Sequence, residues 1–211
     1  TAHYFGGKCL YFDDGAGWIT AHDNVCLRTS GPSVESKGPG VLFANNLLLD
    51  GGWGYANSTT GSAMDPGFSA LGTICGVPLF NGSDSMQFIR NVVSAHNPSL
   101  FSGCWSNDSH PADVSYRPRA AFYFDSNVWW SPNNSLTDLV VFGGTPAGPP
   151  SYTSARFNFS AWQAMGQDVH SVVKDPLLDA ATFTLAPSSP ALALGIHQVR
   201  VDGAGTLPPE V

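Results

Sequence analysis

Short apolar segments, each bounded by turn-forming residues, recur along the whole chain. Six of them are CLYF, WITA, VLFANNLLL, MQFIRNVV, AAFYFDSNVWW and LVVFGG. They are too short for ordinary helices, and Gly, Pro, Asn and Asp separate them. The pattern therefore predicts an all-β protein built from short strands.

An asparagine stands directly before four of the apolar runs. HDNVCL, ANNLLL, IRNVVS and DSNVWW place it at Asn24, Asn46, Asn91 and Asn127. The first spacing is 22 residues, and the second is 45, close to two units of 22. The third is 36, and we interpret the residues beyond 22 as loops. A 22-residue step suits one coil of a parallel β-helix.

Stacked corners explain why asparagine would recur at this position. Its side chain tolerates left-handed backbone, and it can hydrogen-bond to the equivalent asparagine of a neighbouring coil. The apolar residues that follow are then expected to point into the stacked interior. Examples are Val25, Leu47, Val92 and Val128.

Two irregular stretches and a different C-terminal pattern complete the layout. Residues 51–78 and 102–118 are rich in loop-forming residues and are expected to project as long loops. Near the C-terminus, Ser160 and Gln163 form a capping box ahead of AWQAMGQ, so a helix should begin there and end near Gly166. The segment ATFTLAP is expected to be a final strand, and SPALALG a turn.

These elements predict a single domain over residues 1–211. The coils occupy about residues 1–157, and a C-terminal cap occupies about residues 158–211. A helix and a closing strand can cover the end of a stack, whose core and strand edges are otherwise exposed.

Composition and charge narrow the partners. Charged residues make up 12% of the chain, Gly and Pro number 23 and 16, and the formal net charge is −7 with no Lys/Arg cluster. Nucleic acid and anionic lipid are therefore excluded as expected partners. No apolar run approaches the length of a membrane-spanning segment, so no membrane span is expected.

The chain contains more N-glycosylation sequons than the about two that chance would give for this composition. The five are at Asn57, Asn81, Asn107, Asn133 and Asn158. Covalent N-glycans and a secreted, extracellular location are therefore expected. The alternative is that Ser/Thr/Asn-rich loops produce the motifs in an unglycosylated protein.

The four cysteines are Cys9, Cys26, Cys75 and Cys104. They contain no Cys-x-x-Cys pair, and an oxidising secretory route favours two disulfides over four buried free thiols. Three pairings are possible. Cys9 with Cys26 and Cys75 with Cys104 are favoured because each closes a short local loop.

The C-terminal segment FNFSAWQAMGQDVHSVVKDPLLDAATFTLAPSSPALALGIHQV resembles the ending of pectin-lyase-like right-handed parallel β-helix proteins, including secreted polysaccharide-degrading ones. The matching residues are Trp162, Gly166, Gln167, Asp168, His170, Ser171, Asp175, Pro176, Ser189, Pro190, Ala191 and Gly195. The opening is similar to a coil of the same proteins at Gly7, Leu10, Asp13, Asp14, Gly15 and Asn24. The resemblance implies a right-handed parallel β-helix with a short C-terminal capping helix.

A carbohydrate-active enzyme needs a pair of carboxyl groups or a strong base. Asp13 and Asp14 are the catalytic candidates, although adjacent residues on a strand point to opposite faces and would need a partner such as Asp50 or Asp125. Strand termination at Gly15 is the simpler interpretation of the two aspartates. His170 is interpreted as a structural histidine. No metal or cofactor is expected, and a Ca²⁺ site built from single aspartates and carbonyls is the one exception left open.

Two functions follow from these observations. The first is a structural or assembly subunit of an extracellular filament, wall or matrix, which self-associates or joins a larger filament through the N-terminal face of its β-helix. The second is a polysaccharide hydrolase or lyase, or its C-terminal fragment, with a polysaccharide as partner. Family members with this ending usually carry more coils ahead of the Asp-Asp-Gly coil, and those coils complete the substrate groove. We therefore expect the structural role.

Overall fold

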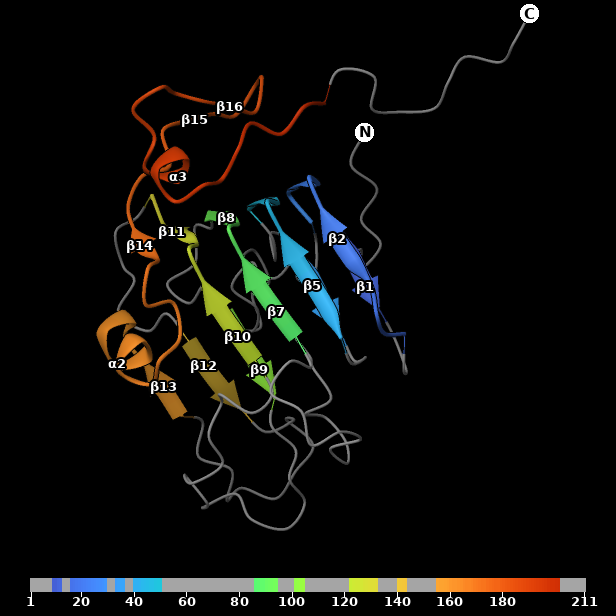
Figure 1. Cartoon of the computed structure of the whole chain (residues 1–211), viewed down its shortest axis with the longest axis vertical. Helices are drawn as coiled ribbons and strands as arrows, with labels where there is room; N and C mark the ends of the chain where they lie inside the picture. Colours follow the sequence, from blue (N-terminus) through green and yellow to red (C-terminus); the bar gives the residue numbers. More distant parts are fainter. Residues whose placement is uncertain are drawn as a thin grey trace, which may run out of the picture.

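The computed structural model of the chain describes residues 9–12, 16–29, 33–36, 40–50, 86–94, 101–104, 122–132, 140–143 and 155–201. Within these ranges the chain is built mostly of short strands with two short helices (Figure 1). All strand pairs are parallel except β12 with β13 and β15 with β16. The expected all-β class with parallel stacking is confirmed.

Two parallel sheets form the centre of the structure. The four-stranded sheet has the order β10-β7-β5-β2, and its strands are β2 (Thr20–His22), β5 (Val41–Ala44), β7 (Met86–Ile89) and β10 (Phe122–Asp125). The five-stranded sheet has the order β14-β11-β8-β6-β3, and its strands are β3 (Val25–Leu27), β6 (Leu47–Leu49), β8 (Val92–Ser94), β11 (Val128–Trp130) and β14 (Val172–Val173).

Smaller sheets and helices complete the described part. The strands are β1 (Leu10–Phe12) with β4 (Val34–Ser36), β9 (Phe101–Cys104) with β12 (Val140–Gly143) and β13 (Ala155–Phe157), and β15 (Leu178–Asp179) with β16 (Thr184–Leu185). The helices are α2 (Phe159–Ala164) and α3 (Pro190–Ala193).

Each strand of the four-stranded sheet leads through a two-residue corner into a strand of the five-stranded sheet. We call strand, corner and strand together a unit, and the four units are β2/β3, β5/β6, β7/β8 and β10/β11. The first corner residue has left-handed backbone in every unit, and the second is asparagine. The left-handed residues are Asp23 (φ 58°), Asn45 (φ 53°), Arg90 (φ 54°) and Ser126 (φ 59°).

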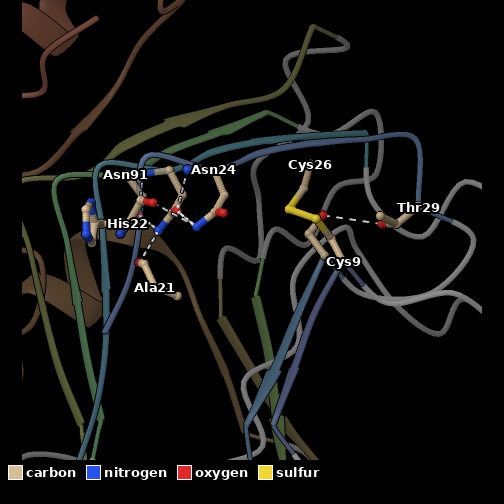
Figure 2. Close-up of a disulfide and its surroundings, with 9 residues drawn as sticks. Cys9, Ala21, His22, Asn24, Cys26, Thr29 and Asn91 are labelled. Atoms are coloured by element: carbon tan, nitrogen blue, oxygen red, sulfur yellow. Dashed lines mark hydrogen bonds between the residues drawn. A yellow bond between two sulfur atoms is a disulfide. The ribbon is translucent and has the colours of Figure 1, made fainter. Parts of the chain in front are cut away.

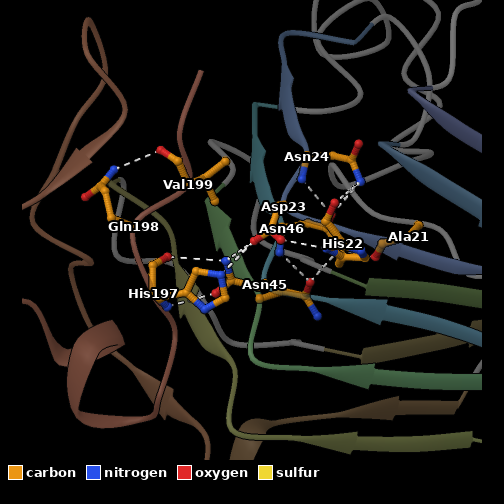
Figure 3. Close-up of polar contacts among 10 residues, drawn as sticks. Ala21, His22, Asp23, Asn24, Asn45, Asn46, His197, Gln198 and Val199 are labelled. Atoms are coloured by element: carbon orange, nitrogen blue, oxygen red, sulfur yellow. Dashed lines mark hydrogen bonds and ion pairs between the residues drawn. The ribbon is translucent and has the colours of Figure 1, made fainter. Parts of the chain in front are cut away.

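The corner asparagines form a continuous ladder of hydrogen bonds. Asn24 donates its backbone N–H and its Nδ2 to Asn46 Oδ1, at 3.0 and 2.9 Å. Asn46 donates in the same way to Asn91 Oδ1, at 2.9 and 2.9 Å. Asn91 repeats the pattern with Asn127 Oδ1, at 2.8 and 3.3 Å. Figures 2 and 3 show parts of this row, and the expected corner stacking is confirmed.

The ladder also satisfies carbonyl groups of the four-stranded sheet. Asn46 Nδ2 donates to the carbonyl of Ala21 at 3.0 Å, and Asn91 Nδ2 donates to that of Phe43 at 3.1 Å. Asn46, Asn91 and Asn127 have no exposed surface. Because buried amides and carbonyls are costly when unpaired, the ladder fixes both the register of the units and the bend between the sheets.

The 45-residue spacing does not contain two units. Asn46 bonds directly to Asn91, and β6 pairs with β8. The interpretation of that spacing as two repeats was therefore wrong, and it holds one unit with a longer connection. The interpretation of the 36-residue spacing as one unit is confirmed, because Asn91 bonds directly to Asn127.

Aromatic rings fill the space between the two central sheets. Phe43, Phe88 and Phe124 occupy equivalent positions on successive strands, with ring centroids 6.2 and 5.3 Å apart. Phe12 lies 5.7 Å from Phe43 at one end, and Trp162 lies 5.6 Å from Phe124 at the other. The five-stranded sheet contributes the inward-pointing residues Cys26, Leu48, Val93 and Trp129.

The residues directly after the corner asparagines point outward, which corrects the expectation that they line the interior. Alternate residues of a strand face opposite sides. Because the asparagine side chain already points inward, the next residue faces away from the core. Val25, Leu47, Val92 and Val128 belong instead to a second cluster, which Leu185, Ala191, Ile196 and Val199 of the C-terminal segment cover.

The C-terminal cap is divided between two places. Trp162 of α2 is fully buried at the end of the stack beyond β10. The chain after β14 instead runs back along the outer face of the five-stranded sheet, as the red segment of Figure 1 shows. It covers a side of the stack rather than its end.

Helix α2 begins at a different residue from the one expected. Its N-cap is Asn158, whose Oδ1 accepts the N–H of Ala161 at 2.8 Å, and Ser160 already lies within the helix. Gln163 Nε2 donates to the carbonyl of Asp168 at 2.9 Å and does not take part in a capping box. The end of the helix near Gly166 is confirmed, because Gly166 has φ 84°.

The disulfide between Cys9 and Cys26 is present, with a Cα–Cα distance of 5.8 Å (Figure 2). It joins the start of β1 to the interior face of β3, where Cys26 is 1% exposed. Closing a loop of this size stabilises the fold by about 3 kcal/mol in the chain-entropy model. The favoured pairing is thus confirmed for Cys9 and Cys26.

We expect Asn91→Ala to lower the free energy of unfolding by about 3 kcal/mol, because it leaves Asn46 Nδ2 and the carbonyl of Phe43 without their partner inside the core. Asn24→Ala is the matched control. Asn24 Oδ1 accepts no hydrogen bond in the described residues, so its loss should cost about 1 kcal/mol. Urea unfolding of both variants measures the difference, and equal losses would contradict the role of the ladder.

Candidate functional site

Most site residues expected from the sequence lie outside the described residues. They are Asp13, Asp14, Asn57, Asn81, Asn107, Asn133 and Cys75. Cys104 lies on β9, and its expected pairing with Cys75 also falls outside the described residues. Asn158 is described and its side chain is exposed. The chemistry that the structure brings together lies at two places, the end of the asparagine ladder and the row of corners.

The ladder ends on two residues of the Gly-Gln-Asp-x-His-Ser motif. Asn127 donates its backbone N–H to Ser171 Oγ at 2.7 Å and its Nδ2 to Asp168 Oδ1 at 2.8 Å. Ser171 Oγ in turn donates to Asp168 Oδ1. Serine and aspartate together replace the next asparagine, so the donors of Asn127 are satisfied without a further unit.

The same motif closes the last strand of the four-stranded sheet. Gln167 Oε1 accepts the N–H of Phe124 at 2.9 Å, and Asp168 N–H donates to the carbonyl of Phe124 at 2.7 Å. Trp162 Nε1 donates to Asp168 Oδ2 at 2.8 Å. A strand edge that would otherwise attract another strand is thus blocked by the Gln167 side chain and the Asp168 backbone N–H.

Asp168 is fully buried, and burial raises the pKa of its carboxyl above the ordinary 3.8. Hydrogen bonds from Ser171, Asn127 and Trp162 act in the opposite direction and offset part of this rise. Three donors that converge on one carboxylate make it an acceptor that terminates the ladder.

An exposed histidine and a nearly buried carboxylate meet beside this terminator. His170 Nδ1 lies 2.8 Å from Asp125 Oδ2, and the His170 N–H donates to Asp125 Oδ1 at 2.9 Å. The side chain of His170 is 73% exposed and that of Asp125 is 13% exposed. Tyr123 also donates its hydroxyl to Asp125 Oδ2, at 3.4 Å.

This arrangement orients the His170 ring through Nδ1 and leaves Nε2 without a hydrogen-bond partner in the described residues. Burial raises the pKa of Asp125, but the two hydrogen bonds from His170, the charge of His170 and the Ser126 N–H together hold that pKa below its ordinary value. A carboxylate that fixes an imidazole in this way suits a general base, whose free nitrogen accepts a proton from a bound molecule. The His170 side chain is therefore held by Asp125, but it is exposed rather than buried.

A second polar cluster joins the C-terminal segment to the corners of the first two units (Figure 3). Asp23 accepts from His197 Nε2 at 2.9 Å and from Asn45 Nδ2 at 2.6 Å, and it lies 2.6 Å from His22 Nδ1. Asn45 also accepts the N–H of His197 at 2.8 Å. Burial raises the pKa of Asp23, whereas its bonds to His22, Asn45 and His197 lower it, and the net pKa lies below 3.8.

In the described ranges, no group of three or more His, Cys, Asp or Glu side chains has the geometry to hold a metal ion. No helix in these ranges is long and apolar enough to cross a membrane.

The sequence offered only part of this arrangement. The pairing of Asp125 with His170 joins residues 45 positions apart, and Asp125 stands in an apolar run where we named it only as a possible partner of Asp13 or Asp14. The position of each residue relative to the ladder did carry a signal. Asp125 stands two residues before Asn127, and His170 stands one residue before Ser171, which takes the place of the next asparagine in the ladder. A motif that continues the ladder should bring these positions together.

Comparison of the chain with protein-family models, with curated proteins and with solved structures finds no match.

We expect Asp168→Ala to reduce the free energy of unfolding by about 4 kcal/mol, because Asn127 Nδ2, Ser171 Oγ and Trp162 Nε1 all lose their acceptor in a buried site. Asp175→Ala is the control, since Asp175 is exposed and accepts one turn hydrogen bond from Leu177, worth about 1 kcal/mol. Chemical denaturation compares the two, and a loss of 1 kcal/mol or less for Asp168→Ala would contradict the terminator role.

We expect the contribution of the Asp125–His170 pair to stability to depend on pH with a defined sign. Because the folded-state pKa of Asp125 is depressed, the contribution is present above about pH 3.8 and is lost as the pH falls through the folded-state value. Since His170 is largely exposed, His170→Ala should cost about 1 kcal/mol at pH 7, and the cost should vanish in strong acid. Thermal unfolding from pH 2 to 7 measures it. In an Asp125→Asn background the substitution should have no such pH dependence.

Proposed function

We propose that the chain forms a right-handed parallel β-helix of the pectin-lyase-like type in a secreted, extracellular N-glycoprotein, and that it serves as a structural or assembly subunit of a filament, wall or matrix. The observation that carries the proposal is the unbroken asparagine ladder. It runs through four units beside a continuous column of aromatic rings, from Phe12 to Trp162.

Such a stack supports a mechanical role. Each unit contacts only its neighbours, so stiffness along the stack depends on the bonds between units. Here every interface between units contains two strand ladders and an asparagine pair, and the pairs Asn46–Asn91 and Asn91–Asn127 are buried. The Cys9–Cys26 disulfide fits the oxidising extracellular setting.

The described sequon is compatible with modification. Asn158 is exposed, and its Oδ1 caps α2, while Nδ2 has no hydrogen-bond partner in the described residues. A glycan on Nδ2 leaves the capping oxygen in place, so the helix and the sugar do not compete for the same atom.

The proposal is tested on native material. We expect glycopeptide analysis to find N-glycans on most of the five sequons, Asn57, Asn81, Asn107, Asn133 and Asn158. We expect electron microscopy with antibodies against the chain to locate it in an extracellular fibrous structure. Unmodified asparagine at four or more sequons, or a freely diffusing monomer in the native source, would overturn the proposal.

A second candidate function rests on the Asp125–His170 pair. An oriented, exposed imidazole beside a tyrosine hydroxyl suits proton transfer in a polysaccharide hydrolase or lyase. Glycoside hydrolysis needs a second carboxyl group, and the one carried by the same turn as His170, Asp168, is fully buried and already accepts three hydrogen bonds, so the structural role is preferred.

A polysaccharide panel tests the second candidate. Release of reducing ends or unsaturated uronates that falls at least a hundredfold in His170→Ala would establish it. His22→Ala is the matched control, since His22 also pairs with an aspartate and is exposed, but belongs to the first unit. Loss of the activity in Asp13→Asn or Asp14→Asn would instead place the chemistry at those residues.

A further inference from the structure

Tyr123 presents a phenol on the outer face of β10. Its neighbour Phe124 points into the aromatic column, so the alternation of the strand turns Tyr123 away from the core. Tyr123 is 44% exposed. A phenol in this position can be reached by a dissolved reagent and by another macromolecule.

A carboxylate and an imidazole stand in line behind this hydroxyl. Tyr123 donates its hydroxyl to Asp125 Oδ2 at 3.4 Å, and His170 Nδ1 lies 2.8 Å from the same oxygen. The His170 side chain is largely exposed, and its Nε2 has no hydrogen-bond partner in the described residues. The three groups therefore form a chain along which a proton can pass from the phenol to water.

The phenol of Tyr123 keeps its proton near neutral pH. Burial and the negative charge of Asp125 both raise the pKa of Tyr123 above its ordinary value. Removal of an electron from a protonated phenol makes its O–H group far more acidic, so the proton has to leave together with the electron. A hydrogen-bonded carboxylate that accepts this proton avoids the protonated radical cation and so speeds the oxidation.

We propose that Tyr123 is a site of oxidative cross-linking, at which a one-electron oxidant converts the phenol to a tyrosyl radical that couples with Tyr123 of a second copy. The inference rests on the proposed assembly role, in which covalent links between chains stabilise the assembly. The oxidant is a peroxidase that uses hydrogen peroxide. The Cys9–Cys26 disulfide fits the oxidising setting that this chemistry needs.

Electrons and protons balance in this reaction. Each Tyr123 loses one electron to the peroxidase and its hydroxyl proton to Asp125, from which the proton passes through His170 to water. The two radicals form a carbon–carbon bond between ring positions ortho to the oxygens, and each of these carbons gives up its hydrogen to restore the phenol. Two electrons and two protons reduce one hydrogen peroxide to two water molecules.

The choice of a second Tyr123 as the coupling partner follows from kinetics. Coupling joins two radicals, so it favours the tyrosine that forms its radical fastest. Every copy of the chain carries the same carboxylate and imidazole behind Tyr123, so every copy forms its radical at this position.

The test compares Tyr123 with Tyr11 in the full chain. Tyr11 is 42% exposed on β1, so its oxidation rate is an internal reference for access of the oxidant. The wild-type chain and its Asp125→Asn variant are treated with a peroxidase and hydrogen peroxide, and mass spectrometry follows each tyrosine and the linked peptides. Asparagine keeps an oxygen for the His170 N–H but is not a base.

We expect Tyr123–Tyr123 linked peptides from the wild-type chain and a covalent dimer that Tyr123→Phe removes. In Asp125→Asn, Tyr123 should be oxidised about tenfold more slowly, a smaller effect than most general bases give because water can also take the proton. The rate of Tyr11 should not change. His170→Ala, which keeps the carboxylate, should slow Tyr123 less than Asp125→Asn does.

Several outcomes would overturn the inference. They are an unchanged rate for Tyr123 in Asp125→Asn, an equal slowing of Tyr11 and Tyr123, or linked peptides that lack Tyr123. Chains recovered from a native fibre without Tyr123 links would also overturn it, while leaving the structural role intact. A freely diffusing native protein would instead refute the structural role, even where Tyr123 couples in the purified chain.

Discussion

The demand that buried amide groups be hydrogen-bonded determines this structure. Asn46, Asn91 and Asn127 each place a side-chain amide where no water can reach it. The amides can be satisfied only if the units stack in register, because each asparagine needs the Oδ1 of the next one. A shift of one residue would turn the asparagines outward and the apolar residues of both sheets to the wrong side. The aromatic column and the sheet pairing therefore depend on the same row of bonds.

A row of this kind cannot end without special chemistry. Its last member presents donors that need acceptors, and one more asparagine would only move the problem by one unit. Asp168 solves it because a carboxylate accepts without having to donate, and it takes bonds from Asn127, Ser171 and Trp162 together. The cost is a buried carboxyl whose pKa is raised by its surroundings. The Asp125–His170 pair lies beside this terminator because the same turn carries Asp168, His170 and Ser171.

The sequence allowed the class of fold, the ladder and one disulfide to be predicted, since each depends on local chemistry. An asparagine before an apolar run indicates a corner wherever it occurs, and Cys9 and Cys26 are close along the chain. The predictions failed where the outcome depended on which side a residue faces. Leu47 and Val92 were assigned to the interior because the corner asparagine was not counted in the alternation of the strand. The 45-residue spacing was misjudged because no local signal separates a long connection from a second unit.

The C-terminal segment that covers the five-stranded sheet has a consequence for biosynthesis. His197 bonds to Asn45, 152 residues earlier, and Ile196 and Val199 bury the outward apolar residues of the first units. A ribosome adds about 5–20 residues per second, so the outer faces of Leu47 and Leu49 wait on the order of ten seconds for their cover. During that interval the nascent chain presents an apolar sheet that can pair with other nascent chains. Premature termination before residue 196 would thus yield an aggregation-prone polypeptide rather than a shortened but functional one.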